Sequence, residues 1–511
     1  MNKSVKAKAL AIILTIMMTV LLTACSPNQG SNLNASSNES ESSTQTTNEP
    51  PVELVMSISS ELPADTQLVL DELNKYLIEK VNAKLKIIGV PFGSYSQQIN
   101  LMMTGQEQLD LMITGPALGF VGQAGKNQLT DLDEYLRSQG QGILDVADKD
   151  MLKVGQVNGK TYAIPIIGQS VQGKGLILRK DLADKYNIDM TKIKTVDDVE
   201  PVLQILKENE PDLIPLVPTR PGVSIVQYFE TGDNLSDDHY IGFLPNFDNG
   251  LKIVNYYETQ EYKDLVNRMK KWYDAGYLLK DGTTNNEQGK ALVLANRAAA
   301  VFGPIGVESD AAYSKNTFGT EVVRAMISEP SVTTATASQI LWSIPRHSKH
   351  PEKAMEVLNL MYTDATFLNL LVYGIEGKHY IKLDDGRIDF PEGMTRKNSP
   401  YPGHLYFLFG NVYLNYVKVP VEADIHERRR ASYEQAIKSK ALGFNFDTTP
   451  VKTKYAAVVS VVNKYKLGLE SGMLDPEKVL PEFISQLKTA GIDEIIAEKQ
   501  KQLDEWAATS K

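Results

Sequence analysis

Histidine, serine and carboxylate side chains are the usual agents of acid–base, nucleophilic and metal chemistry, but their spacing in this chain matches no enzyme motif. None of the six histidines forms HExxH, and His347 and His350 stand in a predicted loop at a helix start, where we expect them to be solvated. The chain has no Gly-x-Ser-x-Gly elbow, and the glycine-rich GQSVQGKG (168–175) lacks the spacing of a phosphate loop. LDDGRIDFPEG (383–393) departs from the EF-hand pattern and predicts a β-hairpin. We therefore expect no catalytic residue, no metal and no cofactor.

Aromatic side chains beside predicted turns offer another kind of chemistry. Their rings can stack on the apolar faces of sugar rings, while carboxylate, amide and guanidinium groups bond the hydroxyls. For any single aromatic residue, packing in the core is the alternative role, and we expect that role for Trp272 and Trp506, which lie in amphipathic helical patterns. The aromatic positions beside turns are Phe92, Tyr95, Phe120, Phe302, Trp342, Tyr373, Tyr380, Tyr401 and the run YFLFGNVYLNY (406–416).

The sole cysteine, Cys25, directly follows a short apolar run. Three lysines within residues 3–8 precede the run, which covers residues 10–22 and is too short to cross about 30 Å of hydrocarbon. This pattern predicts a secretory signal peptide. LTAC (22–25) resembles the bacterial lipobox, and the resemblance implies cleavage before Cys25 and a diacylglycerol thioether on its thiol. An ordinary secretory signal with an incidental cysteine, or an uncleaved helical anchor, is the alternative.

Composition limits the class of protein. Residues 26–51 are almost entirely polar and predict a flexible tether, because such a segment cannot bury enough apolar surface to order itself. The formal net charge of −10 argues against a nucleic-acid partner and against a basic patch for anionic lipid. A hydrophobic fraction of 42% is ordinary for globular protein, and 511 residues exceed what one core usually supports. We expect two lobes.

The elements that follow the tether alternate between strands and helices. Apolar strands are predicted at 52–59, 83–90 and 109–114, with helices near 66–81 and 95–103 between them. This order predicts a parallel sheet with right-handed crossovers, and ligands usually bind at the carboxyl ends of such strands. The loops at those ends are 57–66, 91–95 and 114–119.

A change in character after residue 165 predicts passage into a second lobe. A glycine-rich connection precedes a strand at 175–179, and further elements include a strand at 213–217 and an amphipathic helix that ends near Gly276. The buried strand 298–302 ends at Gly303-Pro304, which we interpret as the return to the first lobe. A strand follows at 340–345, a helix begins at Pro351, and the last hundred residues are mainly helical, with a helix start at Asp475-Pro476 and a break at Gly491.

The lipobox, the tether and a two-lobed α/β body resemble the extracellular solute-binding proteins of ABC importers. Several stretches are similar to the family-1, LipO-like carbohydrate binders of Gram-positive bacteria, and the similarity extends over nearly the whole chain from Cys25. These stretches are YLIEKVNAKLKI, INLMMTGQEQLDLMIT, WSIPRHSKHPEKAMEVLNLMYTD, LLVYGIEGKHYI, LGFNFDTTPVKTKYAAV and LKTAGIDEIIAEKQKQLDEW.

The resemblance implies a type II periplasmic-binding-protein-like fold, in which two lobes close over a ligand. It implies a carbohydrate ligand, ABC permease subunits as partners, a lipid anchor at Cys25 on the extracellular face of the membrane, no nucleic acid, and a monomer. A structural salt bridge is the alternative role for Glu376. The ligand-binding residues that the resemblance implies are Tyr95, Gln169, Phe302, Trp342, Tyr373, Glu376 and Asn411.

The predicted division of the chain starts with a signal peptide at 1–24 and a tether at 25–51. The first lobe takes 52–165 and 299–345, the second takes 166–298 and 346–440, and a C-terminal helical region takes 441–511. Three other functions stay open: the same fold with a peptide or other small polar solute, a surface glycoside hydrolase with paired carboxyls in the cleft, and a purely structural lipoprotein.

Overall fold

The computed structural model describes residues 49–168, 171 and 173–509. Cys25, the signal peptide and most of the tether lie outside the described residues, as does Gln169. The residues from Pro50 onward form one compact unit, here called the body, and it carries the elements described below. Among the described residues, no helix is both long and apolar enough to span a membrane.

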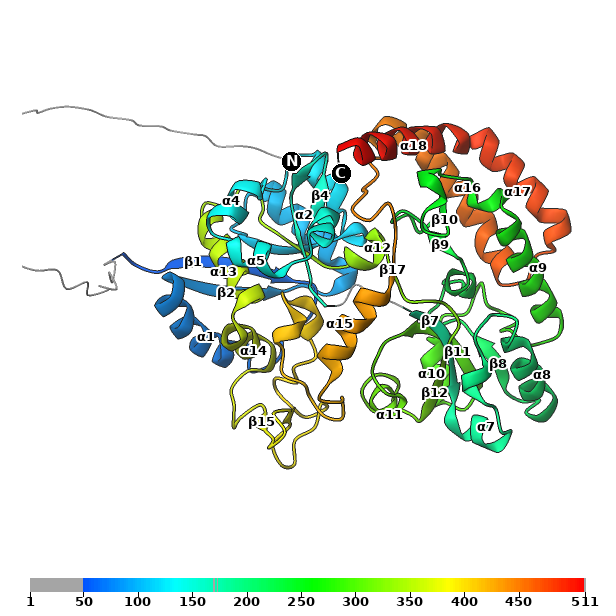
Figure 1. The fold of residues 1–511 in the computed structure, drawn as a ribbon, viewed down its shortest axis with the longest axis horizontal. Helices are drawn as coiled ribbons and strands as arrows, with labels where there is room; N and C mark the ends of the chain where they lie inside the picture. Colours follow the sequence, from blue (N-terminus) through cyan, green and yellow to red (C-terminus); the bar gives the residue numbers. More distant parts are fainter. Residues whose placement is uncertain (1–48, 169–170, 172, 510–511) are drawn as a thin grey trace, which may run out of the picture. The chain divides into compact units, whose positions relative to one another are not determined.

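The first lobe of the body is built on a five-stranded sheet with the order β2-β1-β3-β14-β6 (Figure 1). Three parallel strands form one half of it: β1 (Val52–Ile58), β2 (Ala83–Gly89) and β3 (Leu111–Thr114). They are joined by α1 (Thr66–Val81) and α2 (Phe92–Gly105), as the sequence predicts. β14 (Leu341–Ser343) runs antiparallel to both β3 and β6 (Ile164–Pro165).

The second lobe has a four-stranded mixed sheet with the order β12-β7-β11-β8. Its strands are β7 (Gly173–Arg179), β8 (Ile214–Val217), β11 (Ala298–Ile305) and β12 (Val322–Met326). β11 is parallel to β8 and antiparallel to β7. α8 (Val199–Asn209) and α9 (Gln260–Asp274) bury their apolar faces on this sheet, and Trp272 of α9 is 0% exposed in the resulting core, which confirms its predicted role.

The sheets differ from the predicted division of the lobes. The segment 299–345 was expected in the first lobe, but β11 and β12 belong to the second sheet. β11 does not end at Gly303-Pro304: it continues through Ile305 opposite Gly173. Proline is tolerated at this position because β8 has already ended. No strand on that side is left to accept a hydrogen bond from the backbone N–H that proline lacks.

The segment 346–440 was expected in the second lobe, yet most of it completes the first. α13 (Pro351–Thr363) and α14 (Ala365–Tyr373) pack against the first sheet through apolar side chains such as Met355, Leu358 and Phe367. Leu408, Phe409 and Val412, farther along the chain, join the same core. The amphipathic pattern of these helices shows which face is buried but not which sheet that face covers. Their order in the sequence therefore led to the wrong lobe.

The described chain passes between the lobes near residues 166–168, 327–340 and 436–445. At the second and third of these segments, β13 (Ser331–Val332) pairs in parallel with β17 (Ile437–Lys438). Near the first, Ile167 forms a bridge with Asn411. Short two-residue pairings of this kind join segments of chain without a broad packed interface, so they suit a hinge.

Three C-terminal helices cover the second lobe. They are α16 (Lys452–Glu470), α17 (Pro476–Ala490) and α18 (Ile492–Thr509). The start of α17 at Asp475-Pro476 and the break at Gly491 lie where the sequence predicts, and Asp475 caps α17 by accepting from the Glu477 amide. Phe483 of α17 packs 4.8 Å from the ring of Tyr257, within a cluster that also holds Tyr240, Phe243, Tyr256 and Tyr262. The buried Lys499 ammonium of α18 pairs with Asp237 at 3.2 Å.

Candidate functional site

One edge of the first sheet gathers the carboxyl ends of its parallel strands. β1, β2 and β3 end there, β14 begins opposite the end of β3, and β6 ends opposite Leu341. The loops at this edge approach one another too closely for side chains: a Cβ on Gly89 would lie 2.5 Å from the Ser60 carbonyl oxygen, and one on Gly115 would lie 2.7 Å from that of Gln339. Glycine at both positions therefore lets the loops form one continuous edge.

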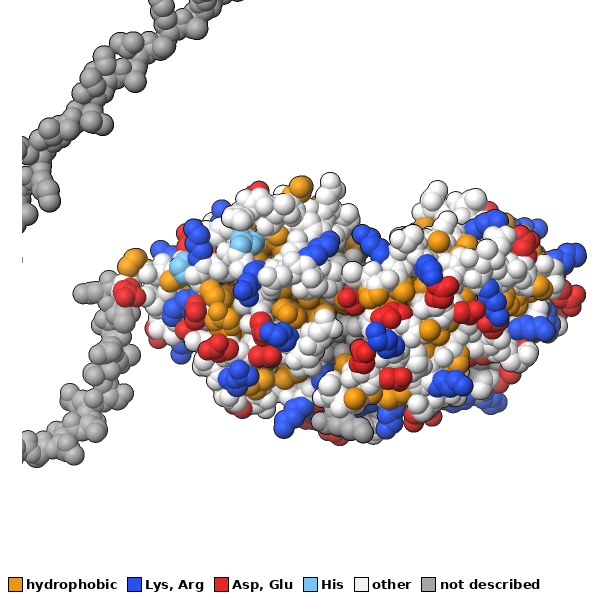
Figure 2. Space-filling view, turned by 90° about the horizontal axis from the view of Figure 1, so that it is seen from above, with side chains coloured by type: hydrophobic (Ala, Val, Ile, Leu, Met, Phe, Trp, Pro, Cys, Tyr) orange, Lys and Arg blue, Asp and Glu red, His pale blue; other side chains and the backbone are white. Residues whose placement is uncertain are grey.

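The second sheet presents a matching edge. β8, β11 and β12 end on the same side as the start of β7. β6 ends at Pro165 on the first edge and β7 begins at Gly173 on the second, so the two edges are neighbours along the chain. Figure 2 shows that the surface of the body is hollowed between its two halves. The loops on both edges are therefore placed to contact one ligand from two sides.

Exposed aromatic rings stand on the first edge. Phe92, the first residue of α2, follows β2 directly and is 66% exposed. Phe407 is 39% exposed, and its ring lies 6.0 Å from that of Tyr406 in an edge-to-face arrangement. The segment that carries Phe407 is tied to the crossover, since Ile167 donates to the Gly410 carbonyl and accepts from the Val412 amide, both at 3.0 Å. Exposed rings on a fixed backbone suit a stacking ligand.

The second edge contributes polar groups. Lys174 at the start of β7 pairs with Glu230 at 2.6 Å, and the Tyr240 hydroxyl donates to the same carboxylate at 3.2 Å. Burial raises the pKa of Glu230, against the opposing effect of the Lys174 charge. Thr219 lies in the loop that follows β8 and Tyr228 lies just beyond that loop. Their hydroxyl groups form a hydrogen bond of 3.1 Å. Such fixed donors and acceptors can bond hydroxyl groups of a ligand.

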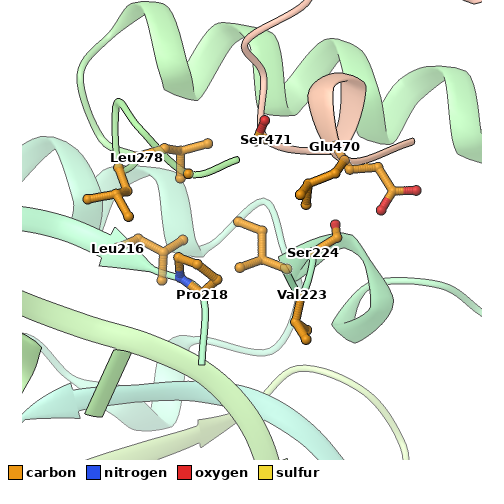
Figure 3. A pocket seen from close by; sticks show the side chains of 11 residues that line it. Leu216, Pro218, Val223, Ser224, Leu278, Glu470 and Ser471 are labelled. Carbon is orange, nitrogen blue, oxygen red and sulfur yellow. The ribbon is translucent and has the colours of Figure 1, made fainter. Parts of the chain in front are cut away.

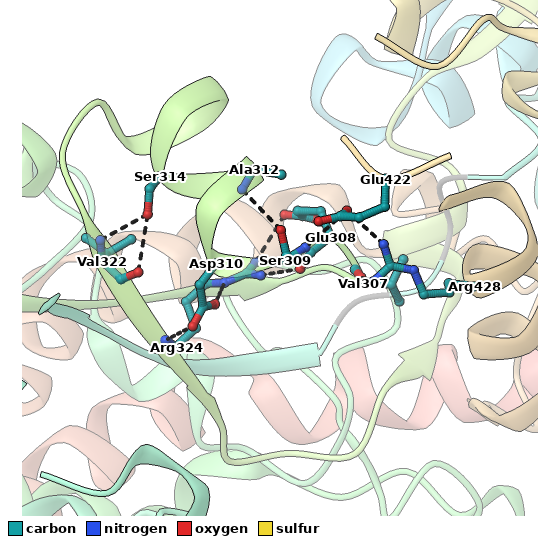
Figure 4. Close-up of polar contacts among 10 residues, drawn as sticks. All are labelled: Val307, Glu308, Ser309, Asp310, Ala312, Ser314, Val322, Arg324, Glu422 and Arg428. Carbon is teal, nitrogen blue, oxygen red and sulfur yellow. Dashed lines mark hydrogen bonds and ion pairs between the residues drawn. The ribbon is translucent and has the colours of Figure 1, made fainter. Parts of the chain in front are cut away.

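A charged network joins the loop after β11 to the segment around α15 (Ile425–Gln435) (Figure 4). Arg428 donates to the Val307 carbonyl at 2.8 Å and to the Glu422 carboxylate at 2.7 Å. Burial alone would raise the pKa of Glu422, but hydrogen bonds from Ser309 and Arg428 outweigh it and lower the pKa to about 2. The network therefore fixes the position of one loop of the second edge.

A cavity inside the second lobe is too small for a sugar. Figure 3 shows one beneath the loop after β8, where Leu216, Pro218 and Leu278 meet Glu470 and Ser471 at the end of α16. Its volume of about 30 Å³ suits an ordered water or two rather than a larger ligand. No group of three or more histidine, cysteine or carboxylate side chains in the described part of the chain is placed to hold a metal ion.

Three of the predicted site residues lie buried beneath the first edge or in the second core. The Tyr95 hydroxyl accepts from the Ile113 amide at 3.0 Å, and the Trp342 indole donates to the Leu408 carbonyl at 2.8 Å. Phe302 packs edge-to-face on Phe229 at 4.7 Å. Each is at most 1% exposed. Direct ligand contact by these residues stays a prediction; in this structure they support the edges from within.

The other predicted residues divide between the interior and the surface. The Tyr373 hydroxyl donates to the Tyr416 carbonyl at 2.9 Å, and the Asn411 amide donates to the Tyr362 carbonyl at 3.2 Å; both side chains are buried. Glu376 is exposed and pairs with Lys382 at 2.7 Å, in agreement with its alternative role. Lys382 belongs to the hairpin of β15 (Ile381–Lys382) and β16 (Ile388–Asp389), which the sequence also predicts.

Sequence reasoning did not single out the residues that the structure places at these edges. Phe92 and Phe407 were among the aromatic positions beside turns, but nothing in the sequence distinguishes an exposed ring from a buried one. Lys174 stands in the glycine-rich crossover, and Glu230 in an irregular loop. The one available signal was position: Phe92 lies in the loop after the strand at 83–90, where ligand contact was expected.

Comparisons with known proteins agree with this architecture. Residues 59–366 match the model of the bacterial extracellular solute-binding proteins, and residues 440–508 match a domain of unknown function (DUF3502). A carbohydrate ABC transporter substrate-binding protein of Streptococcus pneumoniae is 29% identical over 463 residues, covering 86% of this chain and 89% of the relative. Lipoprotein LipO of Bacillus subtilis is 30% identical over 230 residues, 44% of each chain.

Solved structures show the same fold. The N-glycan transport solute binding protein NgtS of Streptococcus pneumoniae is 26% identical and has a TM-score of 0.80, covering 91% of this chain and 100% of NgtS. The complex of NgtS with Man5GlcNAc is also 26% identical, with a TM-score of 0.69 over 91% of this chain and all of NgtS. The fold is that of two-lobed, type II periplasmic binding proteins, as expected. The chain therefore belongs to the family of bacterial extracellular solute-binding proteins.

Proposed function

We propose that this protein is the lipid-anchored, extracellular substrate-binding protein of an ABC importer, and that it captures an oligosaccharide between its two lobes without altering it. The observation that carries the proposal is the pair of exposed rings, Phe92 and Phe407, at the first sheet edge, together with polar groups at the corresponding edge of the second sheet. Relatives described as carbohydrate and N-glycan binders support the class of ligand.

The two edges suit the two kinds of surface on a sugar. Pyranose rings present apolar faces that stack on aromatic side chains, and hydroxyls that accept and donate hydrogen bonds around the perimeter. Phe92 and Phe407 supply the first contact, while Lys174, Thr219 and Tyr228 supply donors and acceptors on the opposite side. A ligand that bridges both edges stabilises the closed arrangement of the lobes.

Comparison with the NgtS structures supports closure on the ligand. The TM-score is 0.80 for one structure of NgtS, 0.72 for its complex with Man1GlcNAc and 0.69 for its complex with Man5GlcNAc. The described body thus resembles the first of these more than either glycan complex, and we infer that ligand binding changes the arrangement of the lobes. The closed form would then be the form that the permease subunits recognise.

The lipid anchor rests on the sequence. Cys25 follows a signal-peptide pattern and precedes a polar tether, and Lipoprotein LipO is among the relatives. Acylation at Cys25 would hold the protein at the outer face of the membrane, while the tether would let the body reach both solvent and permease. Metabolic labelling with a lipid precursor, compared between the wild type and Cys25→Ser, tests this part: label on the wild type alone is expected.

Calorimetric titration with Man5GlcNAc tests the ligand. We expect saturable binding to the wild type and roughly tenfold weaker binding for Phe92→Ala and for Phe407→Ala, because a lost ring stack costs about 1.5 kcal/mol. Leu101→Ala serves as the control, since Leu101 is 58% exposed on the same helix as Phe92 but lies away from the sheet edge. Equal affinity for all four proteins would contradict the proposed site.

Chromatography of the glycan after prolonged incubation with the protein tests the absence of catalysis. The proposal requires the glycan to be recovered unchanged. Release of shorter products that depends on a carboxylate at the sheet edges would instead identify a surface glycoside hydrolase.

A further inference from the structure

A second groove lies outside the facing sheet edges. It has a volume of about 900 Å³, within the range of small-molecule sites. One wall belongs to the first lobe and comprises α4 (Asp133–Ser138), α5 (Gln141–Val146), α6 (Lys149–Leu152) and the hairpin of β4 (Gln156–Val157) and β5 (Lys160–Thr161). The other wall is formed by residues 443–447 and by α18, whose end lies beside β4 (Figure 1).

The lining of this groove combines one accessible aromatic ring with many hydrogen-bonding side chains. Trp506 of α18 was expected in the core, but it is only half-buried, packs edge-to-face on Phe444 at 6.1 Å and lines the groove. Asn158 and Gln502 add amide groups to the lining. A third hollow of about 580 Å³, along β2 and α2, has no aromatic side chain in its lining. The groove therefore differs from an ordinary surface depression by its chemistry.

The two walls carry opposite charge. Three cations, Arg137, Lys149 and Lys153, outnumber the one carboxylate, Asp133, on the first-lobe wall, whereas the other wall carries the carboxylates Asp447, Glu498 and Glu505. Charged donors on one side and carboxylate acceptors on the other can hold a chain of hydroxyl groups from both sides. A ligand with a strong net charge of its own would instead be repelled by one wall.

We propose that this groove is a second saccharide-binding site, in which a sugar ring stacks on Trp506 and its hydroxyls bond Arg137 on one wall and Glu505 on the other. The class of ligand rests on the proposed function, but the site does not, since none of its lining residues lies on the facing sheet edges. α18 packs on the second lobe, so a saccharide held here contacts both lobes and its affinity depends on their arrangement.

Tryptophan fluorescence can report this site selectively. The sequence has three tryptophans, and both Trp272 and Trp342 are 0% exposed, so acrylamide should quench chiefly Trp506. We expect saturating Man5GlcNAc to reduce acrylamide quenching at least twofold in the wild type. The reduction should persist in the Phe92→Ala/Phe407→Ala double variant, whose cleft binds weakly. In a Trp506→Phe variant this change in quenching should be lost, which assigns the signal to Trp506.

Charge variants locate the ligand within the groove. Arg137→Ala and Glu505→Ala both change exposed side chains, and each variant should require about tenfold more glycan to protect Trp506 from acrylamide to the same degree. The affinity of the cleft, measured by calorimetry, should be unchanged. Lys84→Ala, an exposed charge on β2 outside the groove lining, should leave protection unaltered and serves as the matched control.

Two results would overturn this inference while leaving the proposed function intact. In the first, acrylamide quenching does not change although calorimetry shows glycan binding. In the second, the protection of Trp506 disappears in the double variant, so that it reports only the closure of the lobes. Failure of the proposed function has another signature, because the wild type would then give no calorimetric signal from the cleft. Protection of Trp506 without that signal would support the groove by itself.

Discussion

The carboxylate of Glu422 joins two parts of the body that are distant in the sequence, the loop after β11 and the segment around α15. It accepts hydrogen bonds from the Ser309 amide and from Arg428, and these bonds hold its pKa at about 2. A carboxyl whose pKa falls on folding adds stability above its unfolded pKa, near 4.5, and that stability is lost as the pH falls toward 2.

The variant Glu422→Gln tests this contribution. At pH 7 we expect it to melt a few degrees below the wild type, because Arg428 loses a charged partner. The difference should shrink between pH 4.5 and pH 2, where the wild-type carboxyl becomes protonated. Thermal scans across this range measure it, with Glu427→Gln, an exposed neighbour on α15, as the control. A difference that stays constant with pH would show that the charge of Glu422 does not matter.

At the scale of elements, the sequence predicted where strands and helices lie along the chain better than which sheet each of them joins. The patterns at 52–59, 83–90 and 109–114 correspond to β1, β2 and β3, since alternating or buried apolar runs are a local signal. Which sheet receives β11 or α13 depends on contacts between residues far apart in the chain. The Gly303-Pro304 pair therefore predicted a strand end, although β11 continues through it.

The candidate site was predictable only as a location. The loops after β1, β2 and β3 were expected together at one edge of a parallel sheet, and they share one edge; that this edge faces the ligand stays a prediction. Its side chains were not predictable, because exposure is decided by packing: Tyr95 is buried beneath the edge and Phe92, three residues earlier on the same helix, is 66% exposed.

The C-terminal helices provide the prediction at this scale. Phe483 of α17 packs on Tyr257 and on Tyr465, and its side chain is fully buried. Phe483→Ala should lower the free energy of unfolding of the second lobe by about 3–5 kcal/mol, as large-to-small core substitutions do. Urea denaturation followed by Trp272 fluorescence measures this, with the exposed Ser485→Ala as control. A change below about 1 kcal/mol would mean that the helices are dispensable to that lobe.

At the scale of the whole body, two sheets with facing edges and short connecting segments are built to move relative to each other. The pairing of β13 with β17 involves only two residues on each strand, so a small backbone rotation there can close the lobes. Small-angle scattering should show a smaller radius of gyration for the body with Man5GlcNAc than without it. An unchanged radius at saturation would argue against closure.

The most direct measurement is a crystal structure of the protein with Man5GlcNAc. The account predicts the glycan between the two sheet edges, with sugar rings on Phe92 and Phe407 and hydroxyls bonded to groups of the second lobe, and with every glycosidic bond intact. A glycan bound to only one lobe, away from both rings, or a cleaved glycan, would contradict it.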